Sequence, residues 1–182
     1  MMIDQIPQID GVRISQVEYS SDERGAFIKY HPVREFESRL DSVAVSINPN
    51  LGTIRGLHFQ VEPFAEEKLV TCFQGSIFDV IVDLRPNSKT LGMCRTFELS
   101  AKNRLQVYLP KGIAHGFQTL MPHSIIHYSL TSIYSPTSSF AIDPFGDFGF
   151  DWPLKDSLVS QRDSGGVSLS SAIQKYAESL KD

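Results

Sequence analysis

The sequence predicts a single, mainly β domain in which antiparallel strands form a sandwich or barrel, completed by one short C-terminal helix. Short apolar segments follow one another at fairly even intervals through the middle of the chain, and no helical pattern separates them. Strands that follow so closely pair antiparallel, because parallel strands need a longer crossover, usually a helix. The length of 182 residues is that of one ordinary domain rather than two, so residues 1–182 are predicted to form a single unit.

The strands are predicted in chain order from apolar alternation and from the turns that separate them. Alternation with a period of two, typical of a half-buried strand, occurs at Val12 and Ile14 and again at Val43, Val45 and Ile47. A nearly continuous apolar run at 77–82 is typical of a strand covered on both faces. The other predicted strands lie at 54–60, 68–73, 94–99, 105–109, 116–120 and 125–130. Turn-forming residues separate the later strands.

Two helices are predicted, one between the first strands and one at the C-terminus. A short one at 33–40 begins directly after Pro32. At the C-terminus, apolar residues recur at helical spacing from Leu169 to Leu180, and they follow Ser168, a residue type that caps helix N-termini. Residues 135–166 are rich in Ser, Pro, Gly and Asp, but their aromatic residues indicate an irregular connection that is ordered.

Composition and charge exclude several classes of function. No apolar run approaches the ~20 residues of a membrane-spanning helix, so no membrane partner is expected. A net charge of -4 offers no positive field for nucleic acid. Cys72 and Cys94 are too few for a disulfide framework and lack zinc-site spacing, which predicts free thiols in a cytoplasmic protein. The first residues lack the basic end and apolar core of a secretion signal.

Histidines in the predicted strands are the first candidates for chemistry, because histidine titrates near neutral pH. His58 lies in an apolar strand close to Arg55 and Gly56. Residues three apart face opposite sides of a regular strand, but a bulge at Gly56 would turn both side chains into one cavity. The alternative is a buried histidine with a structural role. His127 and Tyr128 are neighbours on a strand, so only one of them can enter a pocket.

The remaining residue types narrow the chemistry further. Lys68 opens a strand, where a solvated lysine is the usual outcome. His58 is followed by Phe59 and Gln60 rather than by a second histidine, so an obvious ligand set for a catalytic metal is missing. Glycine-rich loops that bind dinucleotides or nucleoside triphosphates are also absent. Residue types alone therefore favour acid–base chemistry by a histidine and a tyrosine in a β-sheet cavity, with basic side chains that hold an anionic ligand.

Short blocks of sequence between residues 10 and 165 carry a more specific resemblance. The blocks are DERG at 22–25, IRGLHFQ at 54–60, KLV at 68–70, GxxFDVxVDLR at 75–85, IAHGF at 113–117, Tyr128, YSP at 134–136, DWP at 151–153 and VSQRD at 159–163. In this order they resemble the dTDP-4-dehydrorhamnose 3,5-epimerase family. The resemblance implies a cupin-type jelly-roll barrel, a homodimer and no metal or other cofactor. It also implies a nucleotide-linked ketosugar, a dTDP-bound 4-keto-6-deoxyhexose, as substrate.

The same resemblance implies how an epimerase would use the matching side chains. A proton on a carbon beside a ketone is weakly acidic, because its removal leaves an enolate; inversion then needs a base on one face and an acid on the other. His58 resembles the base, Asp163 the carboxylate that holds its ring, and Tyr128 the acid. Lys68 resembles the family's lysine near the sugar carbonyl, where a positive charge stabilises the enolate oxygen.

Substrate-binding residues are implied in the same way. The positions that match those holding the pyrophosphate, the sugar or the nucleotide in the family are Arg24, Ser46, Asn48, Arg55, His115 and Tyr134. The arginines suit bidentate phosphate contacts. Tyr134 matches the aromatic residue that stacks on the nucleotide base, and 46–48 stands where the family has a Gln-x-Asn run.

Departures from the family pattern occur on the nucleotide side. Lys29 and Ser139 stand where glutamates are usual, and Ser164 stands where a basic residue is common. These differences leave open the nucleotide base, the sugar, and whether C3, C5 or both carbons are inverted. Alternatives are a single-site epimerase, a 3,4-ketoisomerase or a non-catalytic cupin that binds sugar nucleotides. A metal-dependent cupin oxygenase is the alternative that would need a cofactor.

Overall fold

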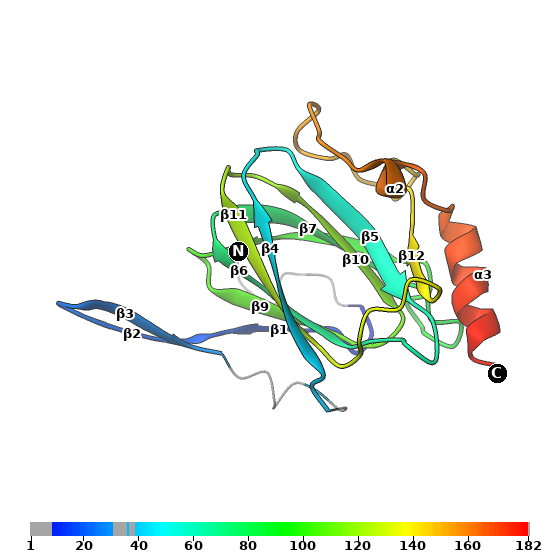
Figure 1. Cartoon of the computed structure of the whole chain (residues 1–182), viewed down its shortest axis with the longest axis horizontal. Coiled ribbons are helices and arrows are strands. Elements are labelled where there is room, and N and C mark those ends of the chain that lie inside the picture. Colours follow the sequence, from blue (N-terminus) through cyan, green and yellow to red (C-terminus); the bar gives the residue numbers. More distant parts are fainter. Residues whose placement is uncertain (1–8, 31–35, 37–38, 182) are drawn as a thin grey trace.

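In the computed structural model, which describes residues 9–30, 36 and 39–181, two five-stranded sheets face each other (Figure 1). The first sheet has the strand order β1 (Arg13–Gln16), β9 (Leu105–Leu109), β6 (Lys68–Gln74), β11 (Ser124–Leu130) and β4 (Ser42–Asn48). The second has the order β12 (Ser139–Ala141), β5 (Ile54–Gln60), β10 (Ile113–Thr119), β7 (Ser76–Asp83) and β8 (Cys94–Ser100). Neighbouring strands pair antiparallel, which confirms the predicted class.

The core has two layers because the second sheet is covered on both faces. On β7, Ile77 and Ile81 point into the space between the sheets, whereas Val80 and Val82 point to the opposite side. There they join a cluster that includes Tyr176 of α3 (Leu169–Ser179). This arrangement confirms the prediction, made from the continuous apolar run at 77–82, of a strand covered on both faces.

The helical predictions have different outcomes. The C-terminal helix is confirmed as α3, and the Oγ of Ser168 accepts a hydrogen bond from the backbone N–H of Ser171 at 3.2 Å, as expected of an N-cap. The short helix predicted at 33–40 falls largely on residues outside the described part, so it stays a prediction. The segment predicted to be irregular contains β12 and a short helix, α2 (Gln161–Ser164). No described helix is both long and apolar enough to cross a membrane.

Two features lie outside the sandwich core. Strands β2 (Glu18–Asp22) and β3 (Gly25–Lys29) form a separate hairpin that projects away from both sheets (Figure 1). On β4, the predicted strand is confirmed, but its apolar residues face outward: Val43, Val45 and Ile47 are 59%, 53% and 66% exposed. The small residues between them, Ala44 and Ser46, line a cavity between the sheets together with Val45.

Candidate active site

A cavity between the two sheets contains most of the residues that the sequence singles out. Two adjoining pockets share Ala44, His58, Lys68 and Tyr128, and we refer to them together as the central cavity. One arm of the central cavity extends to Ser46, Arg55 and His115. The other arm extends to Glu66, Tyr134, Ser139 and Arg162.

A bulge in β5 brings Arg55 and His58 into this cavity together. His58 lies opposite His115 on β10, and Arg55 lies opposite Phe117, so three steps along β5 match two along β10. The additional residue in β5 turns both side chains to the same side of the sheet. Both line the same pocket, as the sequence predicts for a bulge at Gly56.

Gly56 is required at the bulge because the two strands approach each other there. Its φ of +110° lies in a region that side-chain-bearing residues rarely adopt. A Cβ at this position would lie 2.6 Å from both the Cα of Gly116 and the backbone oxygen of His115. The glycine therefore permits the backbone geometry that aims Arg55 and His58 into the central cavity.

Asp163 holds the ring of His58. The short helix α2 carries Asp163 to β5, where its Oδ1 lies 2.7 Å from Nε2 of His58 and its Oδ2 accepts the backbone N–H of Gly56 at 3.1 Å. Burial opposes the ionisation of Asp163, but the hydrogen bonds from His58, Gly56 and Ser160 outweigh it and lower the pKa of the carboxyl. An ionised Asp163 accepts Nε2–H and leaves Nδ1 of His58 free to exchange a proton with a ligand.

Tyr128 reaches the central cavity from the other sheet. Its neighbour on β11, His127, stacks instead on Phe73 with ring centroids 4.6 Å apart, which confirms that only one of the pair enters the cavity. Burial, followed by the charge of Asp79, raises the pKa of Tyr128, so its phenol keeps its proton at neutral pH. A protonated Tyr128 and the paired His58 thus line one cavity from facing sheets.

Lys68 is buried beside His58 rather than solvated, as a strand-opening lysine usually is. Only 9% of its side chain is exposed, and its Nζ lies 3.2 Å from Oε1 of Glu66. The same ammonium donates to the backbone oxygen of His58 at 3.4 Å. Glu66 was not singled out in the sequence, because an acidic residue ahead of a strand ordinarily lies in solvent.

Gln60 connects this ion pair to the segment around Tyr134. Its Nε2 donates to Oε2 of Glu66 at 3.3 Å and to the backbone oxygen of Ile133 at 3.1 Å. Its Oε1 accepts the backbone N–H of Ser135 at 2.8 Å. Gln60 therefore links Ile133 and Ser135, which flank Tyr134, to Glu66, the ion-pair partner of Lys68.

In the arm that contains Arg55, the predicted binding residue Asn48 contacts Arg55 rather than the cavity. Asn48 is fully buried and does not line the central cavity. Its Oδ1 accepts hydrogen bonds from Nε of Arg55 at 2.7 Å and from Oγ of Ser46 at 3.2 Å. Asn48 therefore holds Arg55 in place, while Arg55 and Ser46 themselves line the cavity.

The other arm contains an arginine that the sequence reasoning missed. Arg162 donates from Nη1 to the phenol oxygen of Tyr134 at 3.1 Å and from Nη2 to Oγ of Ser139 at 2.9 Å. Tyr134 is 60% exposed, so its ring is available to a ligand. The one sequence signal for Arg162 was its place next to Asp163.

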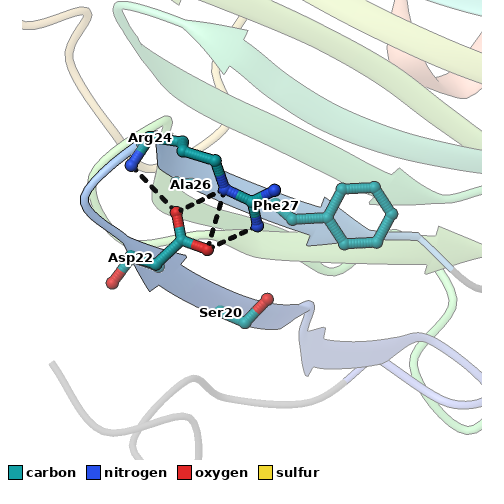
Figure 2. Close-up of a pocket in the computed structure, with 7 residues that line it drawn as sticks. Ser20, Asp22, Arg24, Ala26 and Phe27 are labelled. Carbon is teal, nitrogen blue, oxygen red and sulfur yellow. Dashed lines mark hydrogen bonds and ion pairs between the residues drawn. The ribbon is translucent and has the colours of Figure 1, made fainter.

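Three predicted site residues do not line the central cavity: Asn48, Asp163 and Arg24. Asn48 and Asp163 each hydrogen-bond a residue that does, whereas the side chain of Arg24 hydrogen-bonds Asp22. Arg24 lies in the turn of the β2–β3 hairpin, where its guanidinium forms a 2.6 Å ion pair with Asp22 (Figure 2). Its side chain is 85% exposed. The position of the Arg24 guanidinium is therefore set by the β2–β3 hairpin and not by the two sheets of the sandwich.

Among the described residues, no three or more His, Cys, Asp or Glu side chains are grouped so that they could hold a metal ion. His58 and His115 are each engaged by one carboxylate instead.

A family model and two relatives that match this chain are all described as epimerases of dTDP-4-dehydrorhamnose. Residues 7–171 match the family model described as dTDP-4-dehydrorhamnose 3,5-epimerase. The chain is 38% identical over 167 residues to a protein of that name from Sinorhizobium fredii, covering 87% of this chain and 85% of the relative. It is 33% identical over 171 residues to the dTDP-4-dehydrorhamnose 3-epimerase of Streptomyces niveus, covering 90% and 82%.

A solved structure shares the fold. The 3,5-epimerase from Legionella pneumophila, in complex with dTDP-4-keto-L-rhamnose, superposes with a TM-score of 0.84 at 33% identity. The match covers 91% of each chain. With the two facing antiparallel sheets described above, this similarity confirms the cupin-type jelly roll expected from the sequence.

Proposed function

The chain belongs to the dTDP-4-dehydrorhamnose 3,5-epimerase family, and on this premise we propose that it epimerises C3, C5 or both of a dTDP-linked 4-keto-6-deoxyhexose in deoxysugar biosynthesis. One observation carries the proposal: the His58–Asp163 pair and the protonated Tyr128 line one cavity from two facing sheets. A sugar ring between them has a base on one side and an acid on the other. The reaction needs no cofactor, because the ketone itself stabilises the carbanion as an enolate.

The proposed reaction moves two protons. Nδ1 of His58 removes the proton from a carbon beside the C4 ketone, and the electron pair of that C–H bond shifts onto the ketone oxygen. The imidazolium that forms is stabilised by ionised Asp163, and the enolate oxygen by the ammonium of Lys68. Tyr128 then donates its proton to the opposite face of the carbon. A proton passing from His58 to the tyrosinate, directly or through solvent, restores the starting state.

Positive charge in both arms supports an anionic ligand. Arg55 donates to the neutral Asn48, and Arg162 donates to the hydroxyls of Tyr134 and Ser139. Neither guanidinium forms an ion pair with a carboxylate of the described residues. We propose that these charges and His115 hold the pyrophosphate and the sugar, and that Tyr134 stacks on the base.

The decisive experiment incubates the protein with dTDP-4-keto-6-deoxyglucose in deuterated water and follows the sugar by NMR. We expect deuterium at both C3 and C5. Deuterium at one carbon identifies a single-site enzyme, the activity for which the Streptomyces niveus relative is named. A carbonyl moved to C3 identifies a ketoisomerase. Binding without exchange at either carbon contradicts the enzyme assignment and leaves a sugar-nucleotide-binding protein.

We also propose that the protein is a homodimer. An isolated two-stranded hairpin is marginally stable at best in water, yet β2–β3 projects with Tyr19 and Phe27 46% and 64% exposed. The apolar face of β4 is exposed at a sheet edge, and such edges are normally covered or charged. A second copy that covers these surfaces accounts for both. Arg24 then acts in the central cavity of that second copy.

A charge placed on the apolar face of β4 tests the dimer. We expect Val45→Glu to convert the protein from dimer to monomer in sedimentation, because an interface would bury the carboxylate unpaired. Leu180→Glu, on a residue 48% exposed at the end of α3, is the matched control and should remain dimeric. A monomeric wild-type protein, or a Val45→Glu variant that stays dimeric, contradicts the proposed interface.

A cytoplasmic location is part of the same proposal. Cys72 and Cys94 are both free, and burial raises the pKa values of their thiols to about 11 and about 12. Free thiols are typical of proteins in reducing compartments. The expectation of no nucleic-acid partner rests on the net charge of -4.

A further inference from the structure

Asp79 is a fully buried carboxyl group that has no role in the reaction proposed above. It lies on β7 between Ile77 and Ile81, both of which belong to the core between the sheets. Its Oδ1 is 2.7 Å from Nε2 of His115, and its Oδ2 has no hydrogen-bond partner among the described residues. A buried carboxyl oxygen without a hydrogen bond lowers the stability of the fold, so a functional role for Asp79 has to be considered.

We propose that Asp79 is a positioning residue that keeps a proton on Nδ1 of His115, so that His115 donates a hydrogen bond to an acceptor oxygen of the bound substrate. His115 lines the central cavity, and Asp79 engages its Nε2, so Nδ1 is the ring nitrogen left for a ligand. The choice of ligand rests on the proposed function; the proton position does not.

The proton count of the pair explains why Nδ1 carries hydrogen. A neutral pair has two arrangements: a carboxylate beside an imidazolium, or a carboxylic acid beside an imidazole. They differ only in where one proton lies along the 2.7 Å contact between Oδ1 and Nε2. In both arrangements the other ring proton is on Nδ1. Nδ1 becomes an acceptor only when the pair as a whole loses a proton and becomes negative.

The surroundings oppose that loss. Burial raises the pKa of Asp79, and the interaction with His115 offsets only part of this effect. Of the charged side chains that share this part of the cavity, His58 is engaged by Asp163 and Lys68 by Glu66, whereas Arg55 donates to the neutral Asn48 and is the cation that would favour a negative pair. The complete burial of Asp79 and the lack of a donor at its Oδ2 among the described residues oppose the negative pair. Asp79 and Tyr128 are also coupled, since a negative Asp79 raises the pKa of the phenol. A neutral Asp79–His115 pair therefore provides a fixed donor next to the proposed acid.

The direct test is the nitrogen NMR of the histidine rings in the wild-type protein, with the His115 signals assigned by their loss in His115→Gln. We expect the Nδ1 shift of His115 to lie in the protonated range, both without ligand and with dTDP bound. A non-protonated Nδ1 in both states overturns the proposal. The measurement needs no turnover, so its failure is distinct from a failure of the deuterium-exchange experiment.

A double-mutant cycle tests whether Asp79 acts through His115. We expect Asp79→Leu and His115→Gln each to raise the Kd for dTDP-4-keto-6-deoxyglucose about tenfold, the size of one hydrogen bond to a charged or strongly polar acceptor. The double variant should bind as each single variant does. Effects that multiply, or a folded Asp79→Leu protein with unchanged Kd, overturn the proposal. If Asp79→Leu does not fold, the wild-type NMR measurement decides alone.

A matched control comes from the same strand. Asp83 is also fully buried on β7, but its carboxylate pairs with Arg85 at 2.8 Å, and neither residue lines the central cavity. Asp83→Asn should leave the Kd for the sugar nucleotide unchanged in protein that remains folded. An equal loss of affinity in this variant would show that any disturbance of β7 weakens binding.

Discussion

We expect replacement of His58 with alanine to lower the rate of solvent-deuterium incorporation into dTDP-4-keto-6-deoxyglucose by about 10²–10⁴-fold, the usual contribution of a general base. The reason is geometric. Asp163 engages Nε2 of His58 at 2.7 Å and is itself ionised, so Nδ1 is the basic atom presented to the cavity. The measurement is the initial rate of deuterium entry at C3 and C5 by NMR.

His123 supplies the matched control for this variant. It is an exposed histidine in a turn, with a φ of +58° that asparagine tolerates well, so His123→Asn should exchange deuterium at the wild-type rate. Near-normal exchange in His58→Ala would show that another group removes the proton. A loss shared by both variants would point to a general effect on the fold.

Replacing Tyr128 with phenylalanine separates proton removal from inversion. On the proposed mechanism His58 can still remove and return a proton on its own face, so we expect deuterium to continue to enter the sugar. We expect inversion to fall by about 10²–10⁴-fold, because the variant lacks the proposed proton donor on the opposite face. The product is a deuterated sugar of unchanged configuration, which NMR coupling constants and the deuterium content establish together.

Tyr176 provides the control for loss of a buried phenol. It is 3% exposed and lies in α3, where burial raises its pKa to about 12, but it does not line the central cavity. Tyr176→Phe should keep both exchange and inversion. If Tyr128→Phe loses both rates equally, or inverts at the wild-type rate, Tyr128 is not the acid.

Much of the fold was predictable because strands and helices leave local patterns. The continuous apolar run at 77–82 indicated a strand with two covered faces, and β7 has them. Serine ahead of a helical apolar pattern indicated the start of α3. The β4 strand was also predicted, but not its outward apolar face, because alternation specifies two faces without saying which one meets the core.

The site was predictable to the extent that its residues belong to sequence blocks with a known order. His58, Tyr128 and Lys68 meet in the central cavity, and Asp163 joins His58, as the resemblance implied. The residues that contact these side chains could not be identified from the sequence. Asp79 and Arg162 stand inside the recognised sequence blocks and Glu66 stands just ahead of one, but a carboxylate or guanidinium in the sequence does not reveal which buried group it contacts.

The sequence by itself determined the class of strands, the C-terminal helix, the family and the residue types available for acid–base chemistry, because these depend on neighbours along the chain. Only the tertiary structure decided that a bulge at Gly56 turns Arg55 and His58 the same way. It also decided that Lys68 is buried and that Arg24 projects on a hairpin. These outcomes depend on which distant segments pack together, and burial and pairing between such segments set the charge and the orientation of each reactive group.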